Sequence, residues 1–169
     1  MRIFWFALLV LAVSACATQF NAPSPKLDST KTVYIMPLEN QSNMPMAQAQ
    51  AEQLIASVLA EYGLKVMVYP KLNVNDLQAS LEPQQRLAEA NKWLSNQANG
   101  YVITGSVQEW QYKYGLDGEP AIGVTLTLST SQGNTLWRGS VSKSGWGRES
   151  LSHIALKALE NLLDALNWE

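Results

Sequence analysis

The sequence predicts one α/β domain, in which helices cover a mixed sheet of about five strands in the order β-α-β-α-β-β-β-α. Three observations support this fold class. Residues 32–69 have a strand–helix–strand pattern, residues 101–143 contain three β-rich runs separated by turn residues, and residues 151–166 have the period of an amphipathic helix. Together they predict a three-layer-like sandwich with an antiparallel C-terminal meander and a single hydrophobic core.

The first strand–helix–strand unit begins with β-branched and aromatic residues at 32–36 and ends its first strand at Pro37. A helix is predicted over residues 46–62 and is stopped by Gly63. Its apolar positions recur at helical spacing: Ala47, Ala51, Leu54, Ile55, Val58, Leu59 and Tyr62. A second strand follows at residues 64–69. Because such crossovers are right-handed, the two strands are expected to be parallel neighbours or near-neighbours.

A second helix is predicted from Pro83 to about Gln97, since proline suits the first turn of a helix. Leu87, Ala90 and Leu94 share one face of it. Residues 71–82 are rich in turn-forming side chains and give no clear prediction.

The meander consists of predicted strands at 101–114, 119–130 and 136–143. Strict alternation in the first strand puts Val102, Ser106 and Trp110 on one face and Ile103 and Val107 on the other. In the second strand, alternation predicts a core-facing set made of Ile122, Val124, Leu126 and Leu128. The last helix presents an apolar stripe made of Leu151, Ile154, Ala155, Ala158, Leu159, Leu162, Leu163 and Leu166.

The N-terminus has the features of a secretory signal peptide over residues 1–15. Arg2 precedes an apolar run at residues 3–13, which is too short to span a bilayer permanently, and the small residues Ser14 and Ala15 follow. The chain's only cysteine, Cys16, comes next. A lone cysteine in an exported protein has no intramolecular disulfide partner, so another role is expected for it.

Residues 13–16 resemble the bacterial lipobox, which implies cleavage before Cys16 and acylation of its thiol and its new amine. Several acyl chains hold a protein firmly on a membrane, because each buried CH₂ contributes about 0.8 kcal/mol. No aspartate follows Cys16, which by analogy implies the periplasmic face of the outer membrane. Residues 16–31 are polar and contain Pro23 and Pro25, so they are predicted to form an extended, partly disordered lipidated tether. The domain then spans residues 32–169.

Composition excludes several classes of function. Loss of Arg2 with the signal peptide changes the formal net charge from −2 to −3, and the chain has no basic block, so nucleic acid is not an expected partner. One histidine and one cysteine do not make a zinc site of the usual kind. His153 is interpreted as a structural or solvent-facing residue. No Gly-x-Ser-x-Gly elbow or phosphate-binding glycine loop is present, so neither an enzyme nor a cofactor is expected.

Two features suggest binding. Asp117 and Glu119 lie at a predicted hairpin tip, where they either form an ordinary solvated turn or attract a cationic ligand. Trp146 lies between two glycines in a loop, where its indole either points outward toward a membrane or partner, or folds back over the sheet.

The chain resembles the PelC lipoproteins, which act in export of the Pel exopolysaccharide. The resemblance covers about residues 32–166 and is carried by residues 104–110 (TGSVQEW), 118–124 (GEPAIGV) and 144–151 (SGWGRESL). The start VYIMPLEN at residues 33–40 also resembles a broader group of envelope lipoproteins that includes the curli secretion protein CsgG and the synthase activator LpoB.

The resemblance to PelC implies a non-enzymatic homo-oligomeric ring, expected to be a dodecamer, under the outer membrane and beside a PelB-type porin. It would guide a cationic polysaccharide to the pore. Asp117 and Glu119 would line its periplasm-facing entrance, Trp146 would lie at the membrane side, and Arg148 and Glu149 are candidates for an inter-subunit pair. Two alternatives stay open: a lipoprotein activator of a peptidoglycan synthase, whose family carries a long tether, and a subunit of a curli-type secretion channel.

Overall fold

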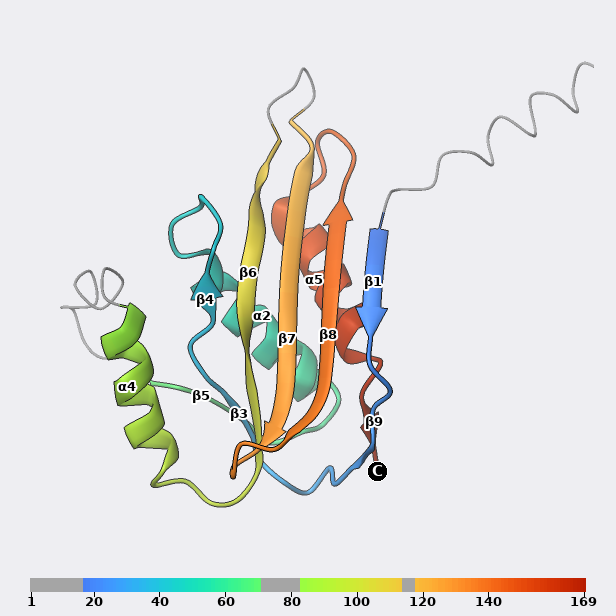
Figure 1. Cartoon of the computed structure of the whole chain (residues 1–169). Helices are drawn as coiled ribbons and strands as arrows, with labels where there is room; N and C mark the ends of the chain where they lie inside the picture. Colours follow the sequence, from blue (N-terminus) through green and yellow to red (C-terminus); the bar gives the residue numbers. More distant parts are fainter. Residues whose placement is uncertain (1–16, 71–82, 114–117) are drawn as a thin grey trace, which may run out of the picture.

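The computed structural model describes residues 17–70, 83–113 and 118–169 and places them in an α/β sandwich (Figure 1). The strands are β1 (Ala17–Asn21), β2 (Lys26–Leu27), β3 (Val33–Ile35), β4 (Glu39–Asn40), β5 (Val66–Val68), β6 (Tyr101–Tyr112), β7 (Pro120–Thr130), β8 (Thr135–Ser144) and β9 (Asn167–Trp168). The helices are α2 (Ala47–Glu61), α4 (Pro83–Leu94) and α5 (Leu151–Leu163). The predicted fold class is confirmed, and β3-α2-β5-α4-β6-β7-β8-α5 follows the predicted order.

The main sheet is mixed, with the strand order β1-β8-β7-β6-β3-β5, and β4 pairs with β6. β3 is parallel to both β5 and β6, as the crossover rule predicts for the first unit. β6, β7 and β8 form the predicted antiparallel meander. The sheet is larger than the five strands predicted, because β1 and β4 also join it.

Helices cover both faces of the sheet unequally. α2 and α5 pack on one face and bury the main core, which includes Ile55, Leu126 and Leu159 (Figure 1). α4 lies on the other side, where Ala90 joins a smaller buried cluster with residues of β3 and β6. Trp93 contacts the rings of Tyr34 and Tyr69 edge to face there.

An ion pair joins α4 to α2. Both carboxylate oxygens of Glu52 lie within 2.8 and 2.9 Å of the Arg86 guanidinium, and the Glu52 side chain is 2% exposed. The backbone N–H of Leu38, just after β3, also donates to Glu52 Oε1 over 2.8 Å. Buried charges of this kind are tolerated only when they are paired and hydrogen-bonded.

The predicted face of Trp110 is wrong. A register shift between Val107 and Glu109 marks a β-bulge in β6, and beyond it Trp110 lies opposite the core residue Ile122. A bulge adds one residue to one strand, so every later side chain changes face. Trp110 is therefore buried with Val107 rather than grouped with Ser106.

Parts of the predicted extended, partly disordered tether pair with the domain. β1 pairs antiparallel with β8 along its whole length, and β2 pairs parallel with β9. Leu27 is 1% exposed and belongs to the main core. Burial of Leu27 and pairing of the backbone groups of β8 hold the segment on the domain. The predicted signal peptide and Cys16 lie outside the described residues.

Candidate functional site

Three connections meet at the end of the sheet where β6 and β8 finish (Figure 1). Tyr112 at the end of β6 pairs with Pro120, and Ser144 at the end of β8 pairs with Ala121. Since β1 is antiparallel to β8, Ala17 lies opposite Lys143 at the same end. We call this region the Trp146 end. The Trp146 end contains Ala17, which follows Cys16 in the sequence, the hairpin of β6 and β7, and the loop after β8.

The loop that carries Trp146 is held by its own backbone and by Glu149. The Glu149 carboxylate accepts the Trp146 N–H over 2.6 Å, and the Gly145 N–H donates to the Pro120 carbonyl over 2.8 Å. A side chain at Gly145 would displace the Glu149 carboxylate from its present position, so the glycine allows Glu149 to approach the loop backbone this closely. The Trp146 indole is left 54% exposed.

Glu149 therefore has a partner within its own chain, while Arg148 is exposed and adopts a left-handed φ of 75°. The hydrogen bond from Trp146 uses one carboxylate oxygen of Glu149. The predicted inter-subunit pairing of Arg148 with Glu149 stays a prediction.

Tyr112 is a residue of this end that sequence reasoning missed. Its hydroxyl accepts the N–H of Leu151, the first residue of α5, over 3.0 Å. This satisfies one of the free donors at the start of the helix. The neighbouring Lys113 donates its ammonium to Ser144 Oγ over 3.1 Å. No pattern in the sequence signalled Tyr112, because its position follows from the bulge in β6.

The acidic tip is only partly described. Asp117 lies outside the described residues, and Glu119 is exposed, with its carbonyl accepting the Lys113 N–H over 2.6 Å. The resemblance implied that the acidic residues and Trp146 face opposite sides of the assembly. That placement in an assembly stays a prediction. Within the single chain, Glu119 and Trp146 lie at the same end, because β8 runs antiparallel to β7 and so returns to the end where β7 begins.

Nothing in the described part of the chain forms a group of three or more metal-ligating side chains. His153 is exposed on the first turn of α5. Among the described helices, none has the length and apolarity needed to cross a membrane.

Tyr62, which follows α2 and lies beside the C-terminal end of α5, has a raised pKa. Partial burial, followed by the charge of Asp164 and of neighbouring glutamates, raises the pKa of Tyr62 above its ordinary value of 10.0. These groups disfavour the phenolate because it would be a further negative charge beside carboxylates.

These features define an α/β sandwich domain with an exposed tryptophan in a loop at one end of its sheet. The lipoprotein GNA1162 from Neisseria meningitidis shares the fold, with 21% identity, a TM-score of 0.56, and coverage of 78% of this chain and 96% of its own.

The chain is more similar to PelC. A PelC dodecamer from Paraburkholderia phytofirmans has 29% identity and a TM-score of 0.75, over 91% of this chain and 99% of that one. A singly substituted form of the same protein, also a dodecamer, gives 29% identity and a TM-score of 0.76 over 91% and 100%. The predicted resemblance to the PelC lipoproteins is thereby confirmed. No protein-family model and no curated protein matches the sequence.

Proposed function

We propose that this protein is a non-enzymatic, lipid-anchored export lipoprotein on the periplasmic face of the outer membrane. It forms a homo-oligomeric ring that guides a cationic exopolysaccharide of the Pel type toward a PelB-type porin. The observation that carries the proposal is the similarity to dodecameric PelC over nearly the whole length of both chains.

The position of β1 supports a membrane-anchored orientation. β1 begins at Ala17, directly after Cys16, and Ala17 pairs with Lys143, three residues before Trp146. Acyl chains on Cys16 would hold the Trp146 end against the bilayer. An exposed indole suits the polar–apolar boundary of a membrane.

The acidic hairpin supports guidance of a cationic polymer. Glu119 adds negative charge at the Trp146 end, Asp117 stands two positions before it in the sequence, and the mature chain carries a formal net charge of −3. A ring of identical copies would repeat this charge around one opening and focus its field. In this arrangement Glu119 lies on the membrane side of the ring, next to the porin.

The paired N-terminal segment weighs against the activator alternative. A synthase activator that crosses the periplasm needs a long free tether, whereas here β1 starts at the residue after Cys16. The solution mass of the acylated full-length protein in detergent, measured by light scattering, tests the proposal. A closed oligomer near twelve copies supports it, and a strict monomer contradicts it.

The role of the acidic tip has its own test. Replacing Asp117 by Asn and Glu119 by Gln should lower polymer secretion in a strain that depends on this protein, without unfolding the domain. The matched control replaces Glu160 by Gln and Asp164 by Asn, which removes equal charge at the far end of α5. Secretion that is unchanged in the first variant, or equally reduced in both, argues against guidance by the tip.

A further inference from the structure

Phe20 is the most exposed large apolar side chain among the described residues, at 75%. Its neighbour Gln19 donates its amide to the carbonyl of Asn161 on α5, so Gln19 lies on the helix-covered face of the sheet. Side chains alternate along a strand, and Phe20 therefore projects from the opposite face. It lies across from Ser140 on β8, on a part of the sheet that no helix covers in Figure 1.

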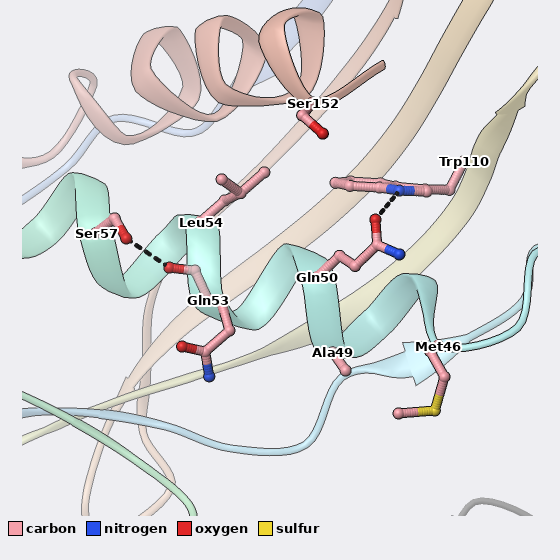
Figure 2. A pocket seen from close by; sticks show the side chains of 8 residues that line it. All are labelled: Met46, Ala49, Gln50, Gln53, Leu54, Ser57, Trp110 and Ser152. Atoms are coloured by element: carbon pink, nitrogen blue, oxygen red, sulfur yellow. Dashed lines mark hydrogen bonds between the residues drawn. The ribbon is translucent and has the colours of Figure 1, made fainter. Parts of the chain in front are cut away.

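An apolar groove lies on the other side of the molecule, between the helices (Figure 2). It is lined by Met46 just before α2, by α2 residues that include Leu54 and Ser57, by Trp110 of β6 and by Ser152 of α5, and its volume is about 460 Å³. Its lining residues are uncharged. Trp110 Nε1 donates to Gln50 Oε1 over 3.1 Å, so the polar atom of the indole is already satisfied within the groove wall.

The two features lie on opposite sides of the protomer, as a ring requires. Identical copies close into a ring through heterologous contacts, in which two different patches of the same chain meet. In a twelve-membered ring each copy is rotated by only about 30° from the next, so the two patches must face nearly opposite directions. The open sheet face and the helix face of a sandwich meet this condition.

The surroundings of Phe20 also suit a contact between copies of one acidic chain. Thr18 lies two residues before Phe20 on β1 and Ser140 lies across from it, both uncharged, while Arg138, two residues from Ser140 on the same face of β8, is positively charged. Each copy carries a net charge of −3, so close approach of charged surfaces would be repulsive. A contact between the uncharged Phe20 side chain and the uncharged groove avoids this repulsion.

We propose that Phe20 of one copy inserts into the α2–α5 groove of the next copy and forms the repeating contact of the assembly. This inference rests on the homo-oligomer of the proposed function and names the surfaces that build it. The occupant of the groove is a second copy of this chain. A lipid acyl chain or another protein in the groove would leave Phe20 without a role in assembly.

Disulfide cross-linking tests the contact directly in the full-length protein in its native membrane. The proposed acylation blocks Cys16, the chain's only natural cysteine, so a disulfide between copies of this chain can form only through the introduced thiols. Phe20→Cys combined with Gln53→Cys at the groove should give, on oxidation, a ladder of multimers of the chain. The matched control combines Phe20→Cys with Leu87→Cys, an exposed position on α4 away from the groove, and should give no ladder.

Assembly of single variants provides the second measurement. Phe20→Asp should raise the concentration at half-assembly in detergent at least tenfold, while Leu87→Ala, which removes another exposed apolar side chain, should not change it. Circular dichroism melts of Phe20→Asp should match those of the wild type, because the side chain is mostly exposed in the single chain.

The outcomes separate this inference from the proposed function. If Phe20→Asp assembles as the wild type does, and the variant with cysteines at positions 20 and 53 gives no ladder of multimers, the contact is overturned and the export function still stands. A wild-type chain that stays monomeric when acylated and in detergent overturns both. A ladder together with dissociation of Phe20→Asp establishes the contact.

Discussion

Replacing Arg86 by Met should destabilise the domain strongly, because it leaves the Glu52 carboxylate buried without its cation. The Glu52 side chain is 2% exposed and that of Arg86 is 14% exposed, so water screens the pair weakly. Breaking a buried ion pair by removing one partner costs about 3–5 kcal/mol. The hydrogen bond from the Leu38 N–H is kept and offsets part of this, which puts the expected loss near 3 kcal/mol.

A second substitution should recover much of that loss. Glu52→Gln added to Arg86→Met removes the stranded charge and keeps an oxygen that accepts the Leu38 N–H. The assay is urea unfolding of residues 17–169 for the wild type, both single variants and the double variant, as a double-mutant cycle. A loss of 3 kcal/mol corresponds to a fall in Tm of about 6–12 °C for a domain of this size.

The exposed ion pair between Lys26 and Glu169 provides the control. The side chains of this pair are 75% and 51% exposed, and Lys26→Met should change stability by less than about 1 kcal/mol. The reasoning is refuted when Arg86→Met costs no more than Lys26→Met, or when the double variant is no more stable than Arg86→Met alone.

Three other substitutions have defined outcomes. Trp146→Ala should keep the free energy of unfolding within about 1 kcal/mol of the wild type, since the indole is 54% exposed, while reducing membrane-linked export; a larger loss of stability in urea would place the indole in the core. Tyr112→Phe should cost about 0.5–1.5 kcal/mol by removing the acceptor for the Leu151 N–H, and an unchanged urea midpoint would show that the bond contributes nothing. The raised pKa of Tyr62 contributes stability that is fully present below the unfolded-state pKa near 10 and is lost as pH rises through the folded-state pKa. Unfolding measured from pH 8 to 12 should show a smaller alkaline loss in Tyr62→Phe than in the wild type, and equal losses would contradict the shift.

The elements with strong periodicity were predictable from the sequence. α2 and α5 carry apolar residues at helical spacing, and Gly63 ends the first helical segment with a φ of 78°. The alternation of Ile122, Val124, Leu126 and Leu128 predicted the buried face of β7 correctly. These predictions depend only on residues close in sequence, which share one face of a helix or one face of a strand.

The elements that depend on distant partners were not predictable. Residues 17–31 have the polar, proline-containing composition of a linker. Parts of them become strands only because β1 pairs with the edge of β8 and β2 pairs with β9. The bulge in β6 leaves no clear mark in the alternation, so the positions of Trp110 and Tyr112 were missed. The pairing of Arg86 with Glu52 joins residues 34 positions apart in sequence.

The sequence by itself determined the fold class, the order of the principal elements, the likeness to PelC and the candidate residues Cys16, Asp117, Glu119 and Trp146. Tertiary structure decided how Glu119, Trp146 and the start of β1 lie relative to each other. Antiparallel pairing of β1 with β8 and of β8 with β7 brings Ala17, Glu119 and Trp146 to one end, and strand alternation turns Phe20 away from the groove beside Trp110. Local periodicity records which face of an element is buried, whereas pairing between distant strands determines which ends and faces meet.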